Sequence, residues 1–204
     1  PFMRDKVKVF YNYIPLNYYK SIEHDEKLMS DEGEAYKILT VCRIDPLKGI
    51  EMAIEACEIL VNKGFQIIWY VLGNGKAKRE VEAMIAERNL EKFFVLLGFQ
   101  LNTLAYIEKC DIFVHPSRTE GKSNSVDEAK YVGKPIVVTN YPTVKEQIED
   151  GVTGIVCGMS GVEIAYSIER LLYNPRIIEE LSRACKHTVD NDYNLTQYLY
   201  DLSR

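Results

Sequence analysis

The chain has 204 residues, enough for one large core or for a domain with appendages, and its 47% hydrophobic and 27% charged residues are ordinary for a globular protein. The formal net charge of -5 gives no basic excess, so nothing in the composition indicates a nucleic acid or an anionic surface as partner. No apolar run approaches the ~20 residues that span a bilayer, and the amino end lacks the apolar core of a signal peptide.

The amino-terminal part differs from the rest of the chain. Residues 6–12 alternate between polar and apolar side chains like an exposed strand. Residues 18–33 are polar and acidic without apolar periodicity, which is typical of a linker or a peripheral helix. The chain also begins with Pro1 instead of Met, so we expect it to be a piece of a longer protein. We predict a boundary near residue 33.

After residue 34, short apolar runs alternate with amphipathic segments. Runs rich in β-branched and aromatic residues predict strands at 36–42, 65–72, 93–97, 112–114 and 135–139. Apolar residues at helical spacing predict helices at 49–63, 76–89, 101–109, 126–132, 161–173, 175–189 and 195–202. Near-continuous apolar strands that alternate with helices are typical of a parallel sheet covered on both faces. We therefore predict an α/β fold, a Rossmann-like doubly wound parallel sheet with additional C-terminal helices.

Two loops that follow predicted strands are candidates for a ligand site, because ligands bind at the carboxyl ends of strands in such a sheet. Arg43 and Lys48 lie in the turn before a helix amino terminus, where the helix dipole also favours an anion. Arg can hold two phosphate oxygens and Lys supplies a mobile charge, but taken alone the pair is better explained as solvated surface charge. The loop Gly73-Asn74-Gly75 permits close backbone approach to a ligand, but taken alone is better explained as a tight turn.

A third loop, residues 120–128, contains two carboxylates and opens a helix. If all these residues were helical, Glu120 and Glu128 would lie roughly 80° apart around the axis and about 12 Å along it, too far to share a proton. With Glu120 in the loop and Glu128 inside the helix, the pair can instead hold two parts of one elongated ligand. Ser123, Asn124 and Ser125 lie near the helix start, where free amides can bind phosphate. The alternative is an acidic first turn that stabilises the helix.

Together the three loops supply the cations, amides and carboxylates that a nucleotide diphosphate carrying a sugar requires. In motif order and spacing the chain resembles the carboxyl-terminal, donor-binding domain of a family-four retaining glycosyltransferase with the two-domain GT-B fold. The resemblance covers about residues 36–157 and is carried by Arg43-x-x-x-x-Lys48-Gly49, Gly73-Asn74-Gly75, Leu97-Gly98-Phe99, Glu120-Gly121-Lys122-Ser123-Asn124 through Glu128-Ala129, and Gly133-Lys134-Pro135-Ile136-Val137.

The resemblance implies a role for each matching residue. Arg43 and Lys48 would contact the donor diphosphate and stabilise the leaving group, and Glu120 would bind hydroxyls of the donor sugar, so these three are expected to be catalytic. Glu128 would accept hydrogen bonds from the ribose hydroxyls. The other residues expected to bind the donor are Gly73, Asn74, Leu97, Gly98, Phe99, Lys122, Ser123, Asn124 and Ser125.

Lys122 departs from the family pattern, because many relatives carry an aromatic residue there. The sequence Glu-Gly-Lys-Ser-Asn nevertheless resembles a subset associated with bacterial surface polysaccharide synthesis. Such enzymes retain the anomeric configuration and need no metal or cofactor, and a UDP- or GDP-linked sugar is the implied substrate. Asp190-Asn191-Asp192 is accordingly interpreted as a surface turn. The 5 cysteines are odd in number and lack metal-ligand spacing, which favours a reduced, cytoplasmic protein.

The resemblance leaves out the family's amino-terminal, acceptor-binding domain. We therefore predict residues 1–33 to be the remnant of that domain and its linker, and residues 34–204 to be the donor-binding domain. Alone it should bind donor and scarcely transfer sugar. The full-length enzyme would transfer a hexose to a glycan or lipid-linked acceptor, with peripheral association at the inner face of the membrane. His115 and His187 do not supply the missing domain's histidine. His115 precedes Pro116 in a strand-end loop and could touch the site, but we expect it to be a satisfied structural histidine.

Three other functions remain open at this stage. A sugar-nucleotide epimerase of GT-B type would share the sheet but needs acid and base carboxylates, usually with a histidine, in one chain. A noncatalytic nucleotide-binding or scaffold module would be favoured if isothermal titration showed no nucleotide diphosphate binding and Glu128→Ala changed nothing. A flavodoxin-like receiver domain would require an acidic cluster after its first strand, where this chain has Arg43 and Lys48.

Overall fold

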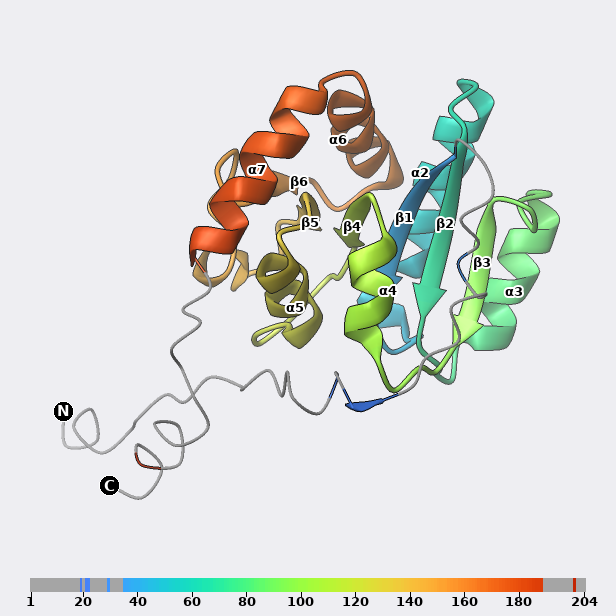
Figure 1. Cartoon of the computed structure of the whole chain (residues 1–204). Helices are drawn as coiled ribbons and strands as arrows, with labels where there is room; N and C mark the ends of the chain where they lie inside the picture. The colour runs from blue at the N-terminus through green and yellow to red at the C-terminus, as the bar shows by residue number, and fades with distance from the viewer. Residues whose placement is uncertain (1–18, 20, 23–28, 30–34, 189–199, 201–204) are drawn as a thin grey trace, which may run out of the picture.

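The computed structural model describes residues 35–188 together with Tyr19, Ser21, Ile22, Met29 and Tyr200. These residues form one sheet of six parallel strands in the order β3-β2-β1-β4-β5-β6 (Figure 1). The strands are β1 (Tyr36–Val41), β2 (Ile67–Leu72), β3 (Phe94–Gly98), β4 (Ile112–His115), β5 (Ile136–Thr139) and β6 (Ile155–Cys157). The predicted α/β, Rossmann-like fold is confirmed.

Helices cover both faces of the sheet (Figure 1). One face carries α2 (Ile50–Asn62), α3 (Lys78–Glu87) and α6 (Gly161–Leu172), and the other carries α4 (Thr103–Lys109) and α5 (Asn124–Val132). The last described helix, α7 (Pro175–Thr188), packs against both α5 and α6. The predicted helices at 161–173 and 175–189 are thus present as α6 and α7.

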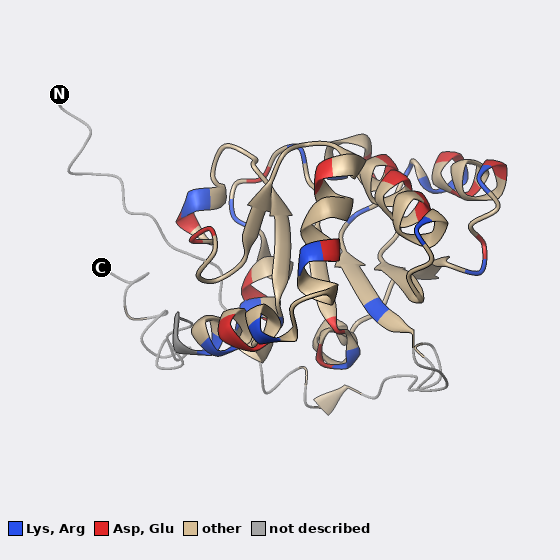
Figure 2. Ribbon diagram, turned by 90° about the horizontal axis from the view of Figure 1, so that it is seen from above, with Lys and Arg blue, Asp and Glu red and all other residues tan. Residues whose placement is uncertain are grey.

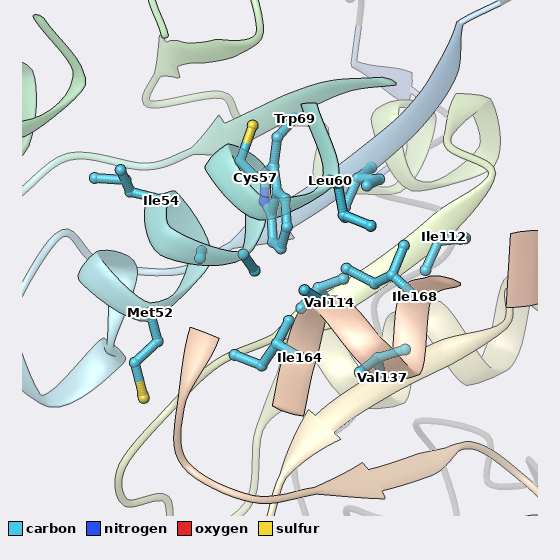
Figure 3. Close-up of a cluster of buried hydrophobic side chains, with 14 of the residues drawn as sticks. Met52, Ile54, Cys57, Leu60, Trp69, Ile112, Val114, Val137, Ile164 and Ile168 are labelled. Carbon is cyan, nitrogen blue, oxygen red and sulfur yellow. The ribbon is translucent and has the colours of Figure 1, made fainter. Parts of the chain in front are cut away.

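The core consists of two apolar layers, because successive side chains of a strand point to opposite faces. Ile38 and Trp69 belong to the layer beneath α2 and α6, whereas their neighbours Leu39 and Tyr70 belong to the layer beneath α4 and α5. Figure 3 shows side chains of α2, of α6 and of strands β2, β4 and β5 in the layer to which Trp69 belongs. The buried indole Nε1 donates to Thr40 Oγ1 at 3.1 Å, so this large side chain leaves no unpaired polar atom in the core.

Several predicted boundaries need correction. The helix expected at 126–132 begins at Asn124, which brings the serines and asparagine of the carboxylate loop into or beside its first turn. The helices expected from residues 76 and 101 begin at Lys78 and Thr103. The sixth strand, β6, was missed because a three-residue apolar run gains strand character only by pairing with β5. The strand expected at 6–12 and the helix expected at 195–202 lie outside the described residues.

The strand order creates a switch point between β1 and β4. The chain leaves β1 towards β2 and β3, and it leaves β4 towards β5 and β6, so the loops after β1 and β4 diverge. In an open α/β sheet this divergence forms the crevice in which ligands bind. The loops that contain Lys48 and Glu120 follow these two strands.

The surface carries charges of both signs. Figure 2 shows Lys and Arg beside Asp and Glu on the outer helices, in keeping with the small net charge of -5. No helix in the described part of the chain combines the length and the apolarity that crossing a membrane requires.

Candidate functional site

A cavity of about 580 Å³ lies at the switch point. Its walls are the loops after β1, β2, β3 and β4 and the amino terminus of α5. Most of the residues expected to bind donor line it: Arg43, Lys48, Gly73, Asn74, Phe99, Glu120, Lys122, Ser123, Asn124, Ser125 and Glu128. Leu97 and Gly98, which end β3, are not among the lining residues, whereas Gln100 in the following loop and Thr103 at the start of α4 are. The chain after β3 therefore reaches the cavity with the residues that follow Gly98.

Lys48 ends a short 3-10 helix, η3 (Pro46–Lys48), whose first turn is capped by the Asp45 side chain. Gly49 follows with φ of 62° and lies so close to the neighbouring loop that a Cβ would stand 2.1 Å from the carbonyl oxygen of Pro116. Only glycine fits this contact. It brings the loop after β1 against the loop after β4.

The close approach of these loops joins three charged or polar side chains. Lys48 Nζ lies 2.5 Å from Glu120 Oε1, and His115 Nε2 lies 2.8 Å from the same oxygen. His115 is the last residue of β4 and lines the cavity, with only 2% of its surface exposed. The expectation that His115 is a satisfied structural histidine therefore needs revision, because it contacts a candidate catalytic carboxylate and its buried Nδ1 has no hydrogen-bond partner among the described residues.

Glu120 is held as a carboxylate. Burial opposes its ionisation, but hydrogen bonds from His115 and Lys48 and their charges outweigh burial and lower the pKa of Glu120 from 4.5 to about 2. The backbone of the loop is fixed as well, since Thr143 Oγ1 donates to the Glu120 carbonyl at 2.8 Å. Glu120 is thus an acceptor at neutral pH and cannot act there as a general acid.

Glu128 sits inside α5, as expected, and its carboxylate is buried, with 6% of the residue exposed. The Tyr19 hydroxyl donates to Oε1 at 2.8 Å and the Thr103 hydroxyl to Oε2 at 2.9 Å. Burial raises the pKa of Glu128, the two hydroxyl donors lower it, and the nearby Asp127 charge raises it, with a net upward shift. The two carboxylates of the 120–128 loop therefore have opposite electrostatic environments.

The amino terminus of α5 faces the cavity with Ser123, Asn124 and Ser125. Gln147 holds this terminus: its side-chain oxygen accepts from the Ser123 amide at 2.8 Å, and its Nε2 donates to the Ser123 carbonyl at 2.9 Å. The Ser123 side chain makes no capping hydrogen bond and instead lies 3.1 Å from Ser125 Oγ. First-turn amides of a helix lack intrahelical acceptors, so this end can receive an anion.

The loop Gly73-Asn74-Gly75 packs against the loop after β1. Gly73 has φ of 137°, and a Cβ there would stand 1.8 Å from the carbonyl oxygen of Cys42. The Ile44 amide also donates to the Asn74 carbonyl at 3.0 Å. The glycine therefore permits close approach between two loops of the protein itself, and it positions Arg43 at the rim, where 69% of the Arg43 side chain is exposed.

Lys122, the departure from the family pattern, lines the cavity and lies 3.2 Å from Asp127 of α5. Asp127 also accepts from Gln147 Nε2 at 2.9 Å. Lys122 is therefore part of the network that supports the α5 terminus. Among the described residues no group of three or more His, Cys, Asp or Glu is arranged to hold a metal ion.

Several residues of the site were not predicted from the sequence as site residues, among them Tyr19 and Gln100, which line the cavity, and His115, Thr103 and Gln147. His115 and Thr103 lie next to recognised motifs, but their contacts with Glu120 and Glu128 depend on the packing of separate elements. Gln147 lies in a segment without any recognised pattern, 24 residues after Ser123, and no sequence signal indicates it.

The chain is similar to known proteins in sequence and in fold. The family model described as "Glycosyl transferases group 1" matches residues 21–189. The amylovoran biosynthesis glycosyltransferase AmsK of Erwinia amylovora is 29% identical over 177 residues, which cover 82% of this chain and 44% of AmsK. The alpha-D-kanosaminyltransferase of Streptomyces kanamyceticus is 32% identical over 148 residues, covering 71% of this chain and 38% of that enzyme. The chain thus spans less than half the length of these relatives.

Solved structures share the fold. Anabaena Alr3699/HepE in complex with UDP-glucose superposes with a TM-score of 0.76 at 21% identity, covering 83% of this chain and 49% of that one. The C-terminal domain of LpcC, a group 1 family protein of Francisella tularensis, gives a TM-score of 0.70 at 23% identity and covers 78% of this chain and 87% of that one. The family match extends over most of the sequence, and the chain belongs to the group 1 glycosyl transferases.

Proposed function

We propose that this chain is the donor-binding half of a retaining glycosyltransferase that moves a sugar from a nucleotide diphosphate sugar to an acceptor. One observation carries the proposal: Lys48 and Glu120 meet at 2.5 Å across the switch point, in the cavity that also receives the α5 terminus and Glu128. A cation, a helix amino terminus and two carboxylates suit a diphosphate flanked by two groups that bear hydroxyls.

The donor would lie along the cavity with its diphosphate near Arg43, Lys48 and the α5 terminus. Glu128 would accept from the ribose, in place of the Tyr19 hydroxyl that now occupies Oε1. Glu120, ionised at neutral pH, would accept from hydroxyls of the transferred sugar. As the sugar–phosphate bond breaks, negative charge grows on the leaving diphosphate, and Lys48 and Arg43 would stabilise it more strongly than in the ground state.

The base would lie at the end of the cavity formed by the loop after β3. Phe99 lines that end with 68% of its surface exposed, and Gln100 is held by a 3.2 Å hydrogen bond to the Leu97 carbonyl. A uridine diphosphate sugar is the donor that we test first, because Alr3699/HepE, whose fold this chain shares, is described in complex with UDP-glucose. A GDP-linked sugar is the second choice.

The acceptor would be supplied through a second domain. The chain spans 44% of AmsK, and we propose that residues 1–33 are the end of an amino-terminal acceptor domain and its linker. The full-length enzyme would then act in surface polysaccharide synthesis on a glycan or lipid-linked acceptor, in the cytoplasm and peripherally at the inner face of the membrane. In support, AmsK is named for amylovoran biosynthesis, and another relative, WcaL of Salmonella typhimurium, is named for colanic acid biosynthesis.

A thermal-shift screen of the isolated chain against UDP, GDP, ADP and their glucose conjugates tests the proposal, because a ligand that binds the native state raises its stability. We expect UDP and UDP-glucose to raise the melting temperature at millimolar concentration. Absence of a shift with every nucleotide, confirmed by isothermal titration, would instead favour a module without donor-binding function.

Lys48→Ala tests whether the diphosphate binds beside Lys48. The change removes the cation that the diphosphate would contact and leaves Glu120 without its ion-pair partner, so UDP binding should weaken by about 1–3 kcal/mol. Lys63→Ala is the matched control, because Lys63 is also ion-paired, with Glu169 at 2.6 Å, but does not line the cavity. Equal UDP affinity in the two variants would refute the placement of the diphosphate.

A further inference from the structure

His115 has an asymmetric environment in the site. Its Nε2 contacts Glu120 Oε1 at 2.8 Å, whereas its buried Nδ1 has no hydrogen-bond partner among the described residues. A histidine kept for internal hydrogen bonding normally has both ring nitrogens satisfied. Here only the nitrogen that faces the candidate catalytic carboxylate is used, which points to that contact as the reason for a histidine at this position.

The role of Nε2 in its hydrogen bond follows from its partner. Glu120 is ionised at neutral pH and offers only acceptors, so Nε2 must carry the hydrogen. The orientation of the ring is fixed by its surroundings: His115 ends β4 in register with Val138 of β5, and the Tyr141 ring meets it edge-on at 5.9 Å between centroids. The Nε2–H group of His115 is therefore held in one direction, towards Glu120 Oε1.

The two donors to Glu120 converge on the same oxygen. Lys48 Nζ and His115 Nε2 both contact Oε1, and no described residue engages Oε2 by a hydrogen bond or an ion pair. A carboxylate pinned through one oxygen cannot rotate freely about its last bond. Glu120 lines the cavity, so the second oxygen remains the acceptor that a ligand can use.

We propose that His115 is a positioning residue for recognition of the donor sugar: its Nε2–H pins Glu120 Oε1 and thereby presents Oε2 to a sugar hydroxyl. The inference rests on the proposed function, and it assigns to His115 an effect on the sugar and none on the nucleotide. Lys48 cannot do this alone, because a flexible ammonium that turns towards a diphosphate loosens its hold on Glu120.

Two substitutions of similar size separate positioning from packing. In His115→Gln the side-chain amide nitrogen reaches the place of Nε2 and keeps a donor for Glu120. In His115→Asn the amide nitrogen lies near the place of Nδ1 and cannot reach Glu120. Both remove the ring from its contact with Tyr141, so a loss that comes from packing appears equally in both.

Isothermal titration of the unaltered chain and both variants with UDP and with UDP-glucose gives the decisive comparison. We expect His115→Asn to bind UDP like the unaltered chain and to lose roughly 3- to 10-fold of its affinity for UDP-glucose, the range for one hydrogen bond. His115→Gln should retain most of the UDP-glucose affinity. Equal losses for both ligands, or equal behaviour of the two variants, would overturn the positioning role.

A second measurement does not depend on any ligand. Nitrogen-15 NMR of the histidine rings at pH 7 should show His115 with its hydrogen on Nε2, and the Glu120→Gln change should alter its shifts. A hydrogen on Nδ1 alone overturns the inference. If UDP fails to bind the unaltered chain while the Nε2–H form is present, the proposed function fails and the contact between His115 and Glu120 stands.

Discussion

The opposite environments of Glu120 and Glu128 predict opposite effects of pH on the stability of two variants. Glu120→Gln and Glu128→Gln each replace a carboxylate with an amide of nearly the same shape, so both variants remove the charge and its titration while the size of the side chain is kept. Glu120 has a folded-state pKa of about 2, below its ordinary 4.5, and Glu128 has a raised pKa.

The magnitude for Glu120 follows from linkage. A carboxyl with a depressed pKa stabilises the fold above its unfolded-state pKa, and this stability is lost as pH falls through the folded-state value. A shift from 4.5 to about 2 corresponds to roughly 3 kcal/mol at pH 7, which falls to about 2 kcal/mol at pH 3.5. The amide keeps part of the hydrogen bonding, so we expect Glu120→Gln to cost about 1–3 kcal/mol at pH 7 and less in acid.

The contribution of Glu128 to folding stability changes with pH in the opposite direction. A carboxyl with a raised pKa favours the folded state when protonated, and this contribution is lost as pH rises through the folded-state pKa. The stability of Glu128→Gln relative to the unaltered chain should therefore increase from pH 3.5 to pH 7, while that of Glu120→Gln decreases.

Urea unfolding at pH 3.5, 5 and 7 measures both trends, with equal m-values required so that the differences report stability alone. Each variant is compared with the unaltered chain at the same pH, which cancels the titration of all other carboxylates. Parallel pH trends for the two variants would refute the electrostatic assignment. A Glu120→Gln variant that is more stable at pH 7 would mean that desolvation exceeds the contacts from Lys48 and His115.

Three further predictions concern the packing of the fold and the Glu128 oxygen that now accepts from Tyr19 and would bind the ribose. Gly73→Ala should lower stability by at least ~1 kcal/mol, because its positive φ and the Cys42 carbonyl exclude a Cβ, whereas Gly121→Ala, with no atom within 4 Å, should change urea unfolding little. Trp69→Ala should cost about 3–5 kcal/mol in the same assay through the loss of a fully buried side chain, and a cost below ~1 kcal/mol would contradict the described core. Tyr19→Phe removes the hydroxyl that occupies Glu128 Oε1, so UDP affinity by titration should rise or stay equal, and a marked fall would show that Tyr19 contributes to binding.

Much of the fold could be predicted because each strand and helix has its own local signal. The apolar runs at β1, β2, β4 and β5 and the helical spacing in α2 and α6 place these elements to within a few residues. The errors fall where local signals are weak. The strand β6 has three residues and depends on its neighbour β5, and the start of α5 is fixed by Gln147 from a distant segment.

The candidate site also has a part that the sequence predicts and a part that it does not. Motif order along the sequence determined Arg43, Lys48, Glu120 and Glu128 as candidates, because a cation, a glycine or a carboxylate at a strand end is visible one loop at a time. The sequence also determined that these loops follow parallel strands, which places them at one edge of a sheet.

Only the tertiary structure decided how the candidates act on one another. Lys48 and His115 contact a single oxygen of Glu120 because Gly49 packs against Pro116. These two residues belong to loops that are far apart in the sequence. Burial and hydrogen-bond partners, which set the opposite pKa shifts of the two carboxylates, arise from this packing. The burial and the hydrogen-bond partners depend on how separate helices, strands and loops pack together, and no local sequence pattern encodes that packing.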